Sequence, residues 1–152
     1  MNSTVQQWKY AGKVSRIGDT LVFPPVSSAH GLYWFSVTQV AETIAGYVGK
    51  AGGRRGLAQR FGNYKRRAVS PRDQHGKAVP LAARDHQLGA TSINARRMLR
   101  AIGTGQTVSV FIIDDSSLAD KAALHRQEKI MIGQLCRSGV VFWNVAGTGG
   151  SK

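Results

Sequence analysis

The sequence predicts an α+β fold in which a small antiparallel sheet of about three strands is flanked by helices. Two neighbouring runs, 31–37 and 45–49, are rich in aromatic and β-branched residues and are typical of paired strands. Runs 56–66 and 91–102 carry apolar residues at helical spacing, and 107–113 is a continuous apolar stretch typical of a buried strand. The chain has 152 residues, which suits one domain with its own core.

The N-terminal part, residues 1–29, is expected to form an extension that contains a hairpin. Residues 14–23 consist of two short extended runs around a Gly-Asp pair, and two prolines end the unit. The first residues lack an apolar stretch followed by a small-residue cleavage site, so we expect no secretory signal.

The two central strands are expected to pair in antiparallel fashion across the connection 37–44. The helix that follows places Leu57, Arg60, Phe61 and Tyr64 on one face, because these positions are separated by three, four and seven residues. An arginine therefore shares the face that should pack inward.

The second half of the chain is expected to alternate loop, helix, strand and helix. Residues 68–90 hold two prolines and several glycines and are expected to form a long loop. Thr91 or Ser92 is a suitable cap for the next helix. Ser117 and Asp120 form a capping-box pattern at the start of a long helix over 117–137.

After that helix, a short apolar run at 140–143 leads into a glycine-rich tail. The tail, 146–152, is expected to be flexible. The element order β-β-α-α-β-α describes one small domain without internal repeats.

Positive charge is concentrated in one third of the chain. The formal net charge is +13, and residues 50–100 supply +11 of it from thirteen Lys or Arg and two Asp. Such a block predicts a polyanionic partner, nucleic acid first and an anionic membrane surface a distant second. The one cysteine, Cys136, excludes an internal disulfide and a zinc site built on several thiolates.

Glu128 is the first residue that suggests chemistry. On the long helix it shares a face with Leu124, Met131 and Leu135, so a carboxylate lies on the face that should pack inward. A buried carboxylate needs an ion pair, a proton or a metal ion. Taken alone, the position is more typical of an ion pair with an arginine than of a metal site, and His125 lies one turn earlier.

Arg60 and three tyrosines form the second group. Arg60 either extends past the core or presents its guanidinium to a group at the edge of the core. Tyr33 and Tyr47 lie on the two adjacent strands, and Tyr64 lies one helical turn after Arg60. Taken alone, each tyrosine is more typical of a packed aromatic side chain than of a catalyst.

These residues together resemble a known family. The run Gly31-Leu32-Tyr33, the run Tyr47-Val48-Gly49-Lys50-Ala51 and the helix with Arg60 and Tyr64 are similar to the signature of the GIY-YIG nucleases. The second run and the helix look especially like the nuclease domain of the bacterial excision-repair incision subunit. GIY-YIG restriction and homing endonucleases share the signature, and the resemblance covers residues 30–145.

The resemblance implies a divalent-metal-dependent DNA endonuclease. Glu128 would hold one divalent cation, Mg²⁺ or Mn²⁺, and Arg60 would contact the scissile phosphate. Tyr33 and Tyr47 would flank the attacking water, one of them as general base with a pKa lowered by nearby cations. The remaining site residues that it implies are Lys50 as an additional cation near the phosphate, Tyr64 in the place where many members have histidine, and Asn144 near the metal-bound carboxylate.

The expected partner is duplex DNA. The connection between Tyr33 and Tyr47 is longer than is usual in the family, so we expect an enlarged loop there, and 68–90 is an insertion into the nuclease core. We expect a cytoplasmic protein of prokaryotic or phage origin that does not bind membranes, as a monomer or a homodimer. The basic residues expected to contact nucleic acid are Arg54, Arg55, Lys65, Arg66, Arg67, Arg72, Lys77, Arg96, Arg97 and Arg100.

Two other interpretations stay open. A non-catalytic nucleic-acid-binding module, such as a degenerate nuclease or an accessory factor, needs only the basic block. A small basic ribosome-associated protein fits the charge but leaves the inward Glu128 and the paired tyrosines without an explanation.

Overall fold

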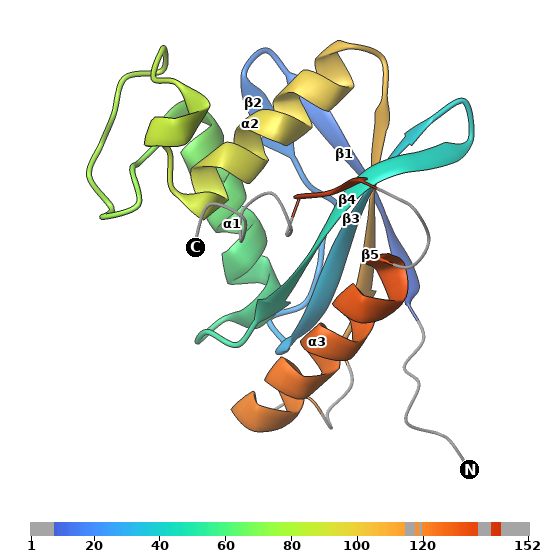
Figure 1. The fold of residues 1–152 in the computed structure, drawn as a ribbon. Helices are drawn as coiled ribbons and strands as arrows, with labels where there is room; N and C mark the ends of the chain where they lie inside the picture. The colour runs from blue at the N-terminus through green and yellow to red at the C-terminus, as the bar shows by residue number, and fades with distance from the viewer. Residues whose placement is uncertain (1–7, 115–117, 119, 137–140, 144–152) are drawn as a thin grey trace.

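The computed structural model describes residues 8–114, 118, 120–136 and 141–143 and has an α+β fold (Figure 1). The order of its elements contains the expected β-β-α-α-β-α series. The strands are β1 (Lys9–Ile17), β2 (Thr20–Val22), β3 (Gly31–Gln39), β4 (Glu42–Ala51), β5 (Thr107–Ile113) and β6 (Val141–Phe142). The helices are α1 (Gly56–Val69), the short 3₁₀ helix η1 (Asp85–Gln87), α2 (Ala90–Gly103) and α3 (Lys121–Cys136).

The sheet is larger than the three strands that the sequence predicted. It has six strands in the order β2-β1-β5-β3-β4-β6, of which five are antiparallel and β6 is a short parallel addition to β4. The expected hairpin of residues 14–23 is present as β1 and β2. It joins the central sheet because β1 also pairs with β5 from Lys9 to Val14. Val14 of β1 is buried in the core of that sheet, which a separate hairpin would lack.

The enlarged loop that we expected between the central strands is absent. β3 and β4 pair from Gly31 with Ala51 to Gln39 with Glu42, so the additional residues lengthen the two strands. A two-residue turn joins them, in which Val40 and Ala41 have φ of 51° and 65°. Val37 and Thr38 belong to the β-forming residue types, which explains why the strand continues into this region.

The helices begin and end near the predicted positions, with differences at their N-termini. α1 begins at Gly56, whose φ is +50°, and the N–H groups of Leu57 and Ala58 donate to the carbonyls of Ala29 and Ser27 at 2.9 and 3.1 Å. These bonds fix the start of α1 beside the segment that leads into β3. The N-cap of α2 is Gly89, which carries no capping side chain, instead of Thr91 or Ser92.

α3 starts later than the predicted residue 117, since its first turn forms after Asp120. The carboxylate of Asp120 accepts the N–H of Ala123 at 3.1 Å, as an N-cap residue does. Ser117, the other half of the predicted capping box, lies outside the described residues, as does the tail 146–152. No helix among the described residues is long and apolar enough to cross a membrane.

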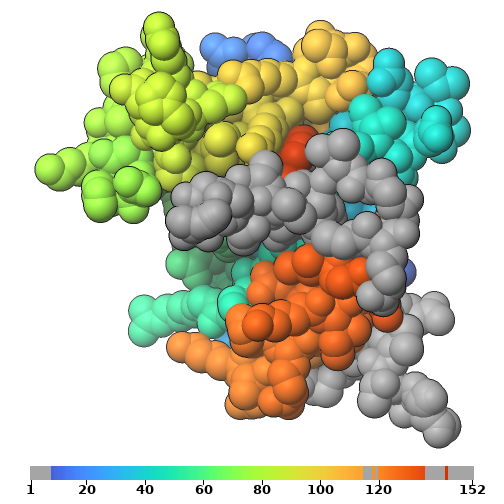
Figure 2. Space-filling model, viewed as in Figure 1, coloured from blue at the N-terminus to red at the C-terminus, as the bar shows by residue number. Residues whose placement is uncertain are grey.

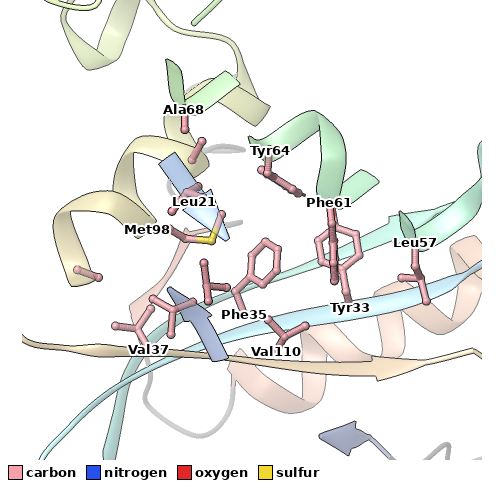
Figure 3. Close-up of a cluster of buried hydrophobic side chains, with 14 of the residues drawn as sticks. Leu21, Tyr33, Phe35, Val37, Leu57, Phe61, Tyr64, Ala68, Met98 and Val110 are labelled. Atoms are coloured by element: carbon pink, nitrogen blue, oxygen red, sulfur yellow. Dashed lines mark hydrogen bonds between the residues drawn. The ribbon is translucent and has the colours of Figure 1, made fainter. Parts of the chain in front are cut away.

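Helices cover both faces of the sheet. α1 and α2 pack over the face that carries Tyr33 and Phe35, and Figure 3 shows Leu57, Phe61 and Tyr64 pointing from α1 toward these strands. α3 packs over part of the opposite face, where Leu124 and Met131 meet the side chains of Leu32, Val48 and Ile113. The β4 strand therefore runs between α1 and α3.

The loop that joins α1 to α2 is held by hydrogen bonds and ion pairs. In Figure 2 it stands out from the body of the molecule at the upper left. The carboxylate of Asp85 accepts from Arg100 at 2.7 and 2.9 Å and from Arg96 at 3.2 Å. Arg96 also donates to the carbonyls of Leu81 and Ala83. Two arginines of α2 thus fix a loop that the composition alone described as irregular.

Candidate active site

Three tyrosines and Arg60 meet on the face of the sheet that α1 covers. The Tyr33 hydroxyl lies 2.8 Å from the Tyr64 hydroxyl and accepts a hydrogen bond from Nε of Arg60 at 3.1 Å. The ring of Tyr47 lies 6.2 Å from the ring of Tyr33, and the guanidinium of Arg60 lies 5.3 Å from the centre of the Tyr64 ring. We call these four residues the tyrosine–arginine cluster.

Burial distinguishes the tyrosines from one another. Tyr33 and Tyr64 are fully buried, whereas Tyr47 is half-buried. Burial raises the pKa of Tyr33 and of Tyr64 well above the usual range for a phenol. Burial also raises the pKa of Tyr47, and Arg60 opposes that rise only in part. The lowered pKa that the sequence led us to expect is thus not seen for either strand tyrosine in the protein alone.

The guanidinium of Arg60 is a largely buried cation on the α1 side of the sheet. Its pKa is raised: burial lowers it, but the surrounding tyrosines Tyr33 and Tyr64 outweigh that effect. No carboxylate among the described residues forms an ion pair with it. Burying an uncompensated charge is costly, and an anion bound at the cluster would offset that cost.

Gly49 is required by the packing of Tyr33. The two residues are partners across β3 and β4. A β-carbon on Gly49 would overlap the hydroxyl and Cζ of Tyr33 and would lie 2.8 Å from Cε2 of Tyr47. The glycine therefore leaves the space in which the Tyr33 hydroxyl reaches Arg60.

Glu128, Lys50 and His125 form a second group on the α3 side of the sheet. Nζ of Lys50 lies 3.5 Å from Oε1 of Glu128 and 3.0 Å from Nδ1 of His125, and His125 lies 3.9 Å from the same carboxylate oxygen. The Glu128 side chain is 16% exposed, so its carboxylate is held near the surface but largely out of water. The predicted inward face of α3 is confirmed, since Leu124 and Met131 are buried.

The two groups meet along β4. Tyr47 faces α1 and Lys50 faces α3, because successive side chains of a strand point to opposite faces. The pairing of β4 with β6 covers only Ala45 and Gly46 and ends before Tyr47. Although Glu128 lies on the other side of the strand, its negative charge adds to the effect of burial in raising the pKa of Tyr47. Six of the seven predicted catalytic residues thus lie at one end of β4, and the seventh, Asn144, lies outside the described residues.

A divalent cation is compatible with this arrangement. Mg²⁺ is commonly held by one or two carboxylates, with water and substrate phosphate as its other ligands. Glu128 offers one such carboxylate, which is largely shielded from water. Within the described part of the chain, no group of three or more Asp, Glu, His or Cys side chains lies together, so Glu128 would hold the ion with water and substrate.

The basic residues predicted to bind nucleic acid fall into three sets. Arg96 and Arg100 are paired with Asp85 and hold the loop, a role that sequence reasoning missed although Asp85 is one of only two acids in residues 50–100. The exposed members that form no ion pair with Asp85 are Arg54, Arg55, Lys65, Arg66 and Lys77. The third set, Arg67, Arg72 and Arg97, lines a cavity between α1, the loop and α2.

Comparison with protein-family models, curated proteins and solved structures finds no match for this chain. A function for this protein is therefore inferred from the arrangement of its residues. The resemblance to the GIY-YIG nucleases therefore rests on the residues described above and on their arrangement.

Proposed function

We propose that this protein is a divalent-metal-dependent DNA endonuclease of the GIY-YIG type. The observation that supports the proposal is that Arg60 and the Glu128 carboxylate lie on the two sides of the same end of β4, where Tyr47 senses the charge of both. A buried cation beside a carboxylate that can hold a metal ion is the combination that phosphodiester hydrolysis needs.

Arg60 binds the scissile phosphate in this proposal. Its Nε is fixed by Tyr33, and no carboxylate of the described chain neutralises it. The guanidinium then stabilises the charge that develops on the phosphate oxygens in the transition state. Removal of one such interaction typically slows the chemical step by about 10²–10³-fold.

Tyr47 is the tyrosine that we assign to the attacking water. It is half-buried, whereas the hydroxyl of Tyr33 is fully buried between Arg60 and Tyr64. Hydrolysis forms a bond from the water oxygen to phosphorus, breaks the bond to one deoxyribose oxygen and removes one proton from the water. Tyr47 accepts that proton or orients the water, and Tyr33 acts as a positioning residue for Arg60.

Glu128 and Lys50 complete the site from the α3 side. A divalent cation bound at Glu128 would polarise the phosphate oxygens and lower the pKa of bound water. Lys50 lies 3.5 Å from Glu128 and orients the carboxylate when no cation is bound. His125 contacts Lys50 and limits the positions that its ammonium can take.

The exposed basic residues support DNA as the substrate class, because a chain of charge +13 associates with polyanions through phosphate contacts. The alternative, a non-catalytic nucleic-acid-binding module, is favoured by the same charge but does not require the Glu128 arrangement.

Nicking of supercoiled plasmid separates the two functions. We expect the purified protein to convert supercoiled plasmid to the open circular form in Mg²⁺ and to leave it intact in EDTA. Binding of a labelled duplex should persist in EDTA. A protein that binds DNA tightly and does not cleave it at any Mg²⁺ or Mn²⁺ concentration would be the non-catalytic module.

A further inference from the structure

A cavity of about 900 Å³ lies between the C-terminal end of α1, the loop 70–89 and the first turn of α2. Arg67 of α1, Arg72 of the loop and Arg97 in the middle of α2 line it. Burial and then the charges of Arg72 and Arg66 lower the pKa of Arg67, so the guanidinium groups of Arg67 and Arg72 repel each other, and an anion between them would relieve that repulsion.

Neutral groups hold these arginines in place. Nη1 of Arg67 donates to the carbonyl of Ser70 at 3.2 Å, and Nη1 of Arg72 donates to the carbonyl of Gly76 at 2.7 Å. Nη1 of Arg97 donates to Oδ1 of Asn94 at 3.2 Å and to the carbonyl of Trp143 at 3.4 Å. No ion pair neutralises any of the three within the described part of the chain.

The acids that line the same cavity are already used. Oδ1 of Asp73 accepts the N–H groups of His75 and Lys77 at 2.8 and 2.9 Å. Asp85 is paired with Arg96 and Arg100. In addition, Nε of Arg72 is buried and has no hydrogen-bond partner. A buried donor without a partner costs free energy, and an acceptor oxygen in the cavity would remove that cost.

The position of the cavity relative to the candidate active site follows from α1. Arg60 and Arg67 are seven residues apart, which places them on the same side of the helix about two turns apart. That separation is about 10 Å along the helix axis, so a nucleic-acid strand that passes along α1 can contact both arginines through different phosphates.

We propose that Arg67, Arg72 and Arg97 form a second phosphate pocket, which binds a backbone phosphate of the nucleic acid near the bond held at Arg60. The inference rests on the proposed function for the identity of the strand. The chemistry that the pocket recognises is a phosphate group, and its source is the nucleic acid and not a free phosphate ion.

The test uses the full chain carrying Glu128→Gln in EDTA, so that binding is measured without cleavage. Arg72→Gln and Arg97→Gln are compared with Arg84→Gln, which removes the same charge from the same region outside the cavity lining. Fluorescence anisotropy with a labelled duplex, from low to moderate salt, gives the affinity and its salt dependence.

We expect each pocket variant to bind about tenfold more weakly, and the slope of log K against log salt to fall by about 0.9, the value for one lost phosphate contact on duplex DNA. Arg84→Gln should change both quantities less. Equal effects of all three variants, or no change in the slope for the pocket variants, would overturn the pocket.

A second arm identifies the source of the phosphate. Inorganic phosphate should compete with the duplex only at concentrations where sulfate, at matched ionic strength, competes equally. Phosphate-specific stabilisation of the folded protein that disappears in Arg72→Gln, with unchanged duplex binding, would show a free-phosphate site and refute the proposal.

The two proposals fail separately. Wild-type protein that never nicks plasmid, together with weaker duplex binding by Arg72→Gln, would refute the nuclease and retain the pocket. Nicking that is normal in Arg72→Gln at every substrate and salt concentration, with unchanged binding, would refute the pocket and retain the nuclease.

Discussion

Because the two strand tyrosines are assigned different roles, the same Tyr→Phe change should mainly lower stability at one position and mainly slow cleavage at the other. Tyr33→Phe removes a hydroxyl that lies 2.8 Å from the Tyr64 hydroxyl and 3.1 Å from Nε of Arg60, at a site that is fully buried. Both partners would lose their contact in a place that water does not enter. We therefore expect the free energy of unfolding to fall by about 1–3 kcal/mol.

Tyr47→Phe removes a hydroxyl from a half-buried ring and should cost less than about 1 kcal/mol, because water can replace the lost contacts. Its effect on cleavage should be the larger one, about 10²–10⁴-fold, the usual contribution of a general acid or base. Tyr33→Phe should slow cleavage by about 10²-fold through the loss of one fixed contact to Arg60.

Urea denaturation and plasmid nicking measure the two effects. The midpoint should shift for Tyr33→Phe with the same dependence on urea, which shows a change of stability and not of the denatured state. Tyr64→Phe is the matched control, because it removes the other hydroxyl of the buried pair. A Tyr33→Phe protein with wild-type stability, or a Tyr47→Phe protein with wild-type cleavage, would refute the assignment of roles.

Three further predictions concern pH, the loop and the turn. Burial keeps the pKa of Tyr47 above its usual range, so the fraction of Tyr47 present as phenolate should rise with pH up to that pKa. The rate of nicking at saturating Mg²⁺ should therefore increase about tenfold per pH unit between about pH 6 and 9. A plateau of the rate in that window would exclude Tyr47 as the base. Hydrogen bonds from Arg100 and then Arg96 lower the pKa of Asp85. The stability that Asp85 contributes should therefore be complete above the unfolded pKa of about 3.9 and lost as pH falls through the lower folded pKa. Asp85→Asn should destabilise the protein by about 1 kcal/mol at pH 7 in thermal unfolding, and an equal destabilisation at pH 2 would contradict this. Replacing Val40-Ala41 by Asn-Gly should raise the free energy of unfolding by about 1 kcal/mol, since both positions have positive φ. The urea midpoint of this variant should therefore be higher than that of the wild type. A lower midpoint would contradict a turn with positive φ at both positions.

Local patterns predicted most of the elements. The apolar run at 107–113 is β5, and the helical spacing of Leu57, Phe61 and Tyr64 gives α1. The shared face of Leu124, Glu128 and Met131 on α3 is also confirmed. These features depend on residues close in the sequence, which is why spacing alone shows them.

Long-range pairing could not be predicted in the same way. The β1 strand pairs with β5, more than ninety positions later in the chain, and nothing in residues 9–17 indicates which strand they pair with. The turn at Val40-Ala41 lacks the usual glycine or asparagine, so its sequence resembles a continuing strand. Arg96 and Arg100 carry the same charge as the exposed arginines, and only the folded loop brings Asp85 to them.

In the candidate site too, some features could be predicted from the sequence and others depend on long-range packing. The resemblance placed Tyr33, Tyr47 and Arg60 together, and their hydrogen bonds and ring contacts agree with that placement. The difference in burial between Tyr33 and Tyr47 depends on the packing of Phe61 and Tyr64 around Tyr33, because Phe35 contacts both rings. No spacing rule contains that information, and it decides which tyrosine can meet water.

The most direct test of the nuclease is the rate of plasmid nicking in Mg²⁺ for Glu128→Gln against Glu42→Gln. Both variants replace a glutamate by its neutral isostere, but Glu42 is exposed at the far end of β4 from Tyr47 and Lys50. We predict that Glu42→Gln nicks at the wild-type rate and that Glu128→Gln is slower by at least about 10²-fold, with duplex binding retained. Undiminished nicking by Glu128→Gln would contradict the proposed active site.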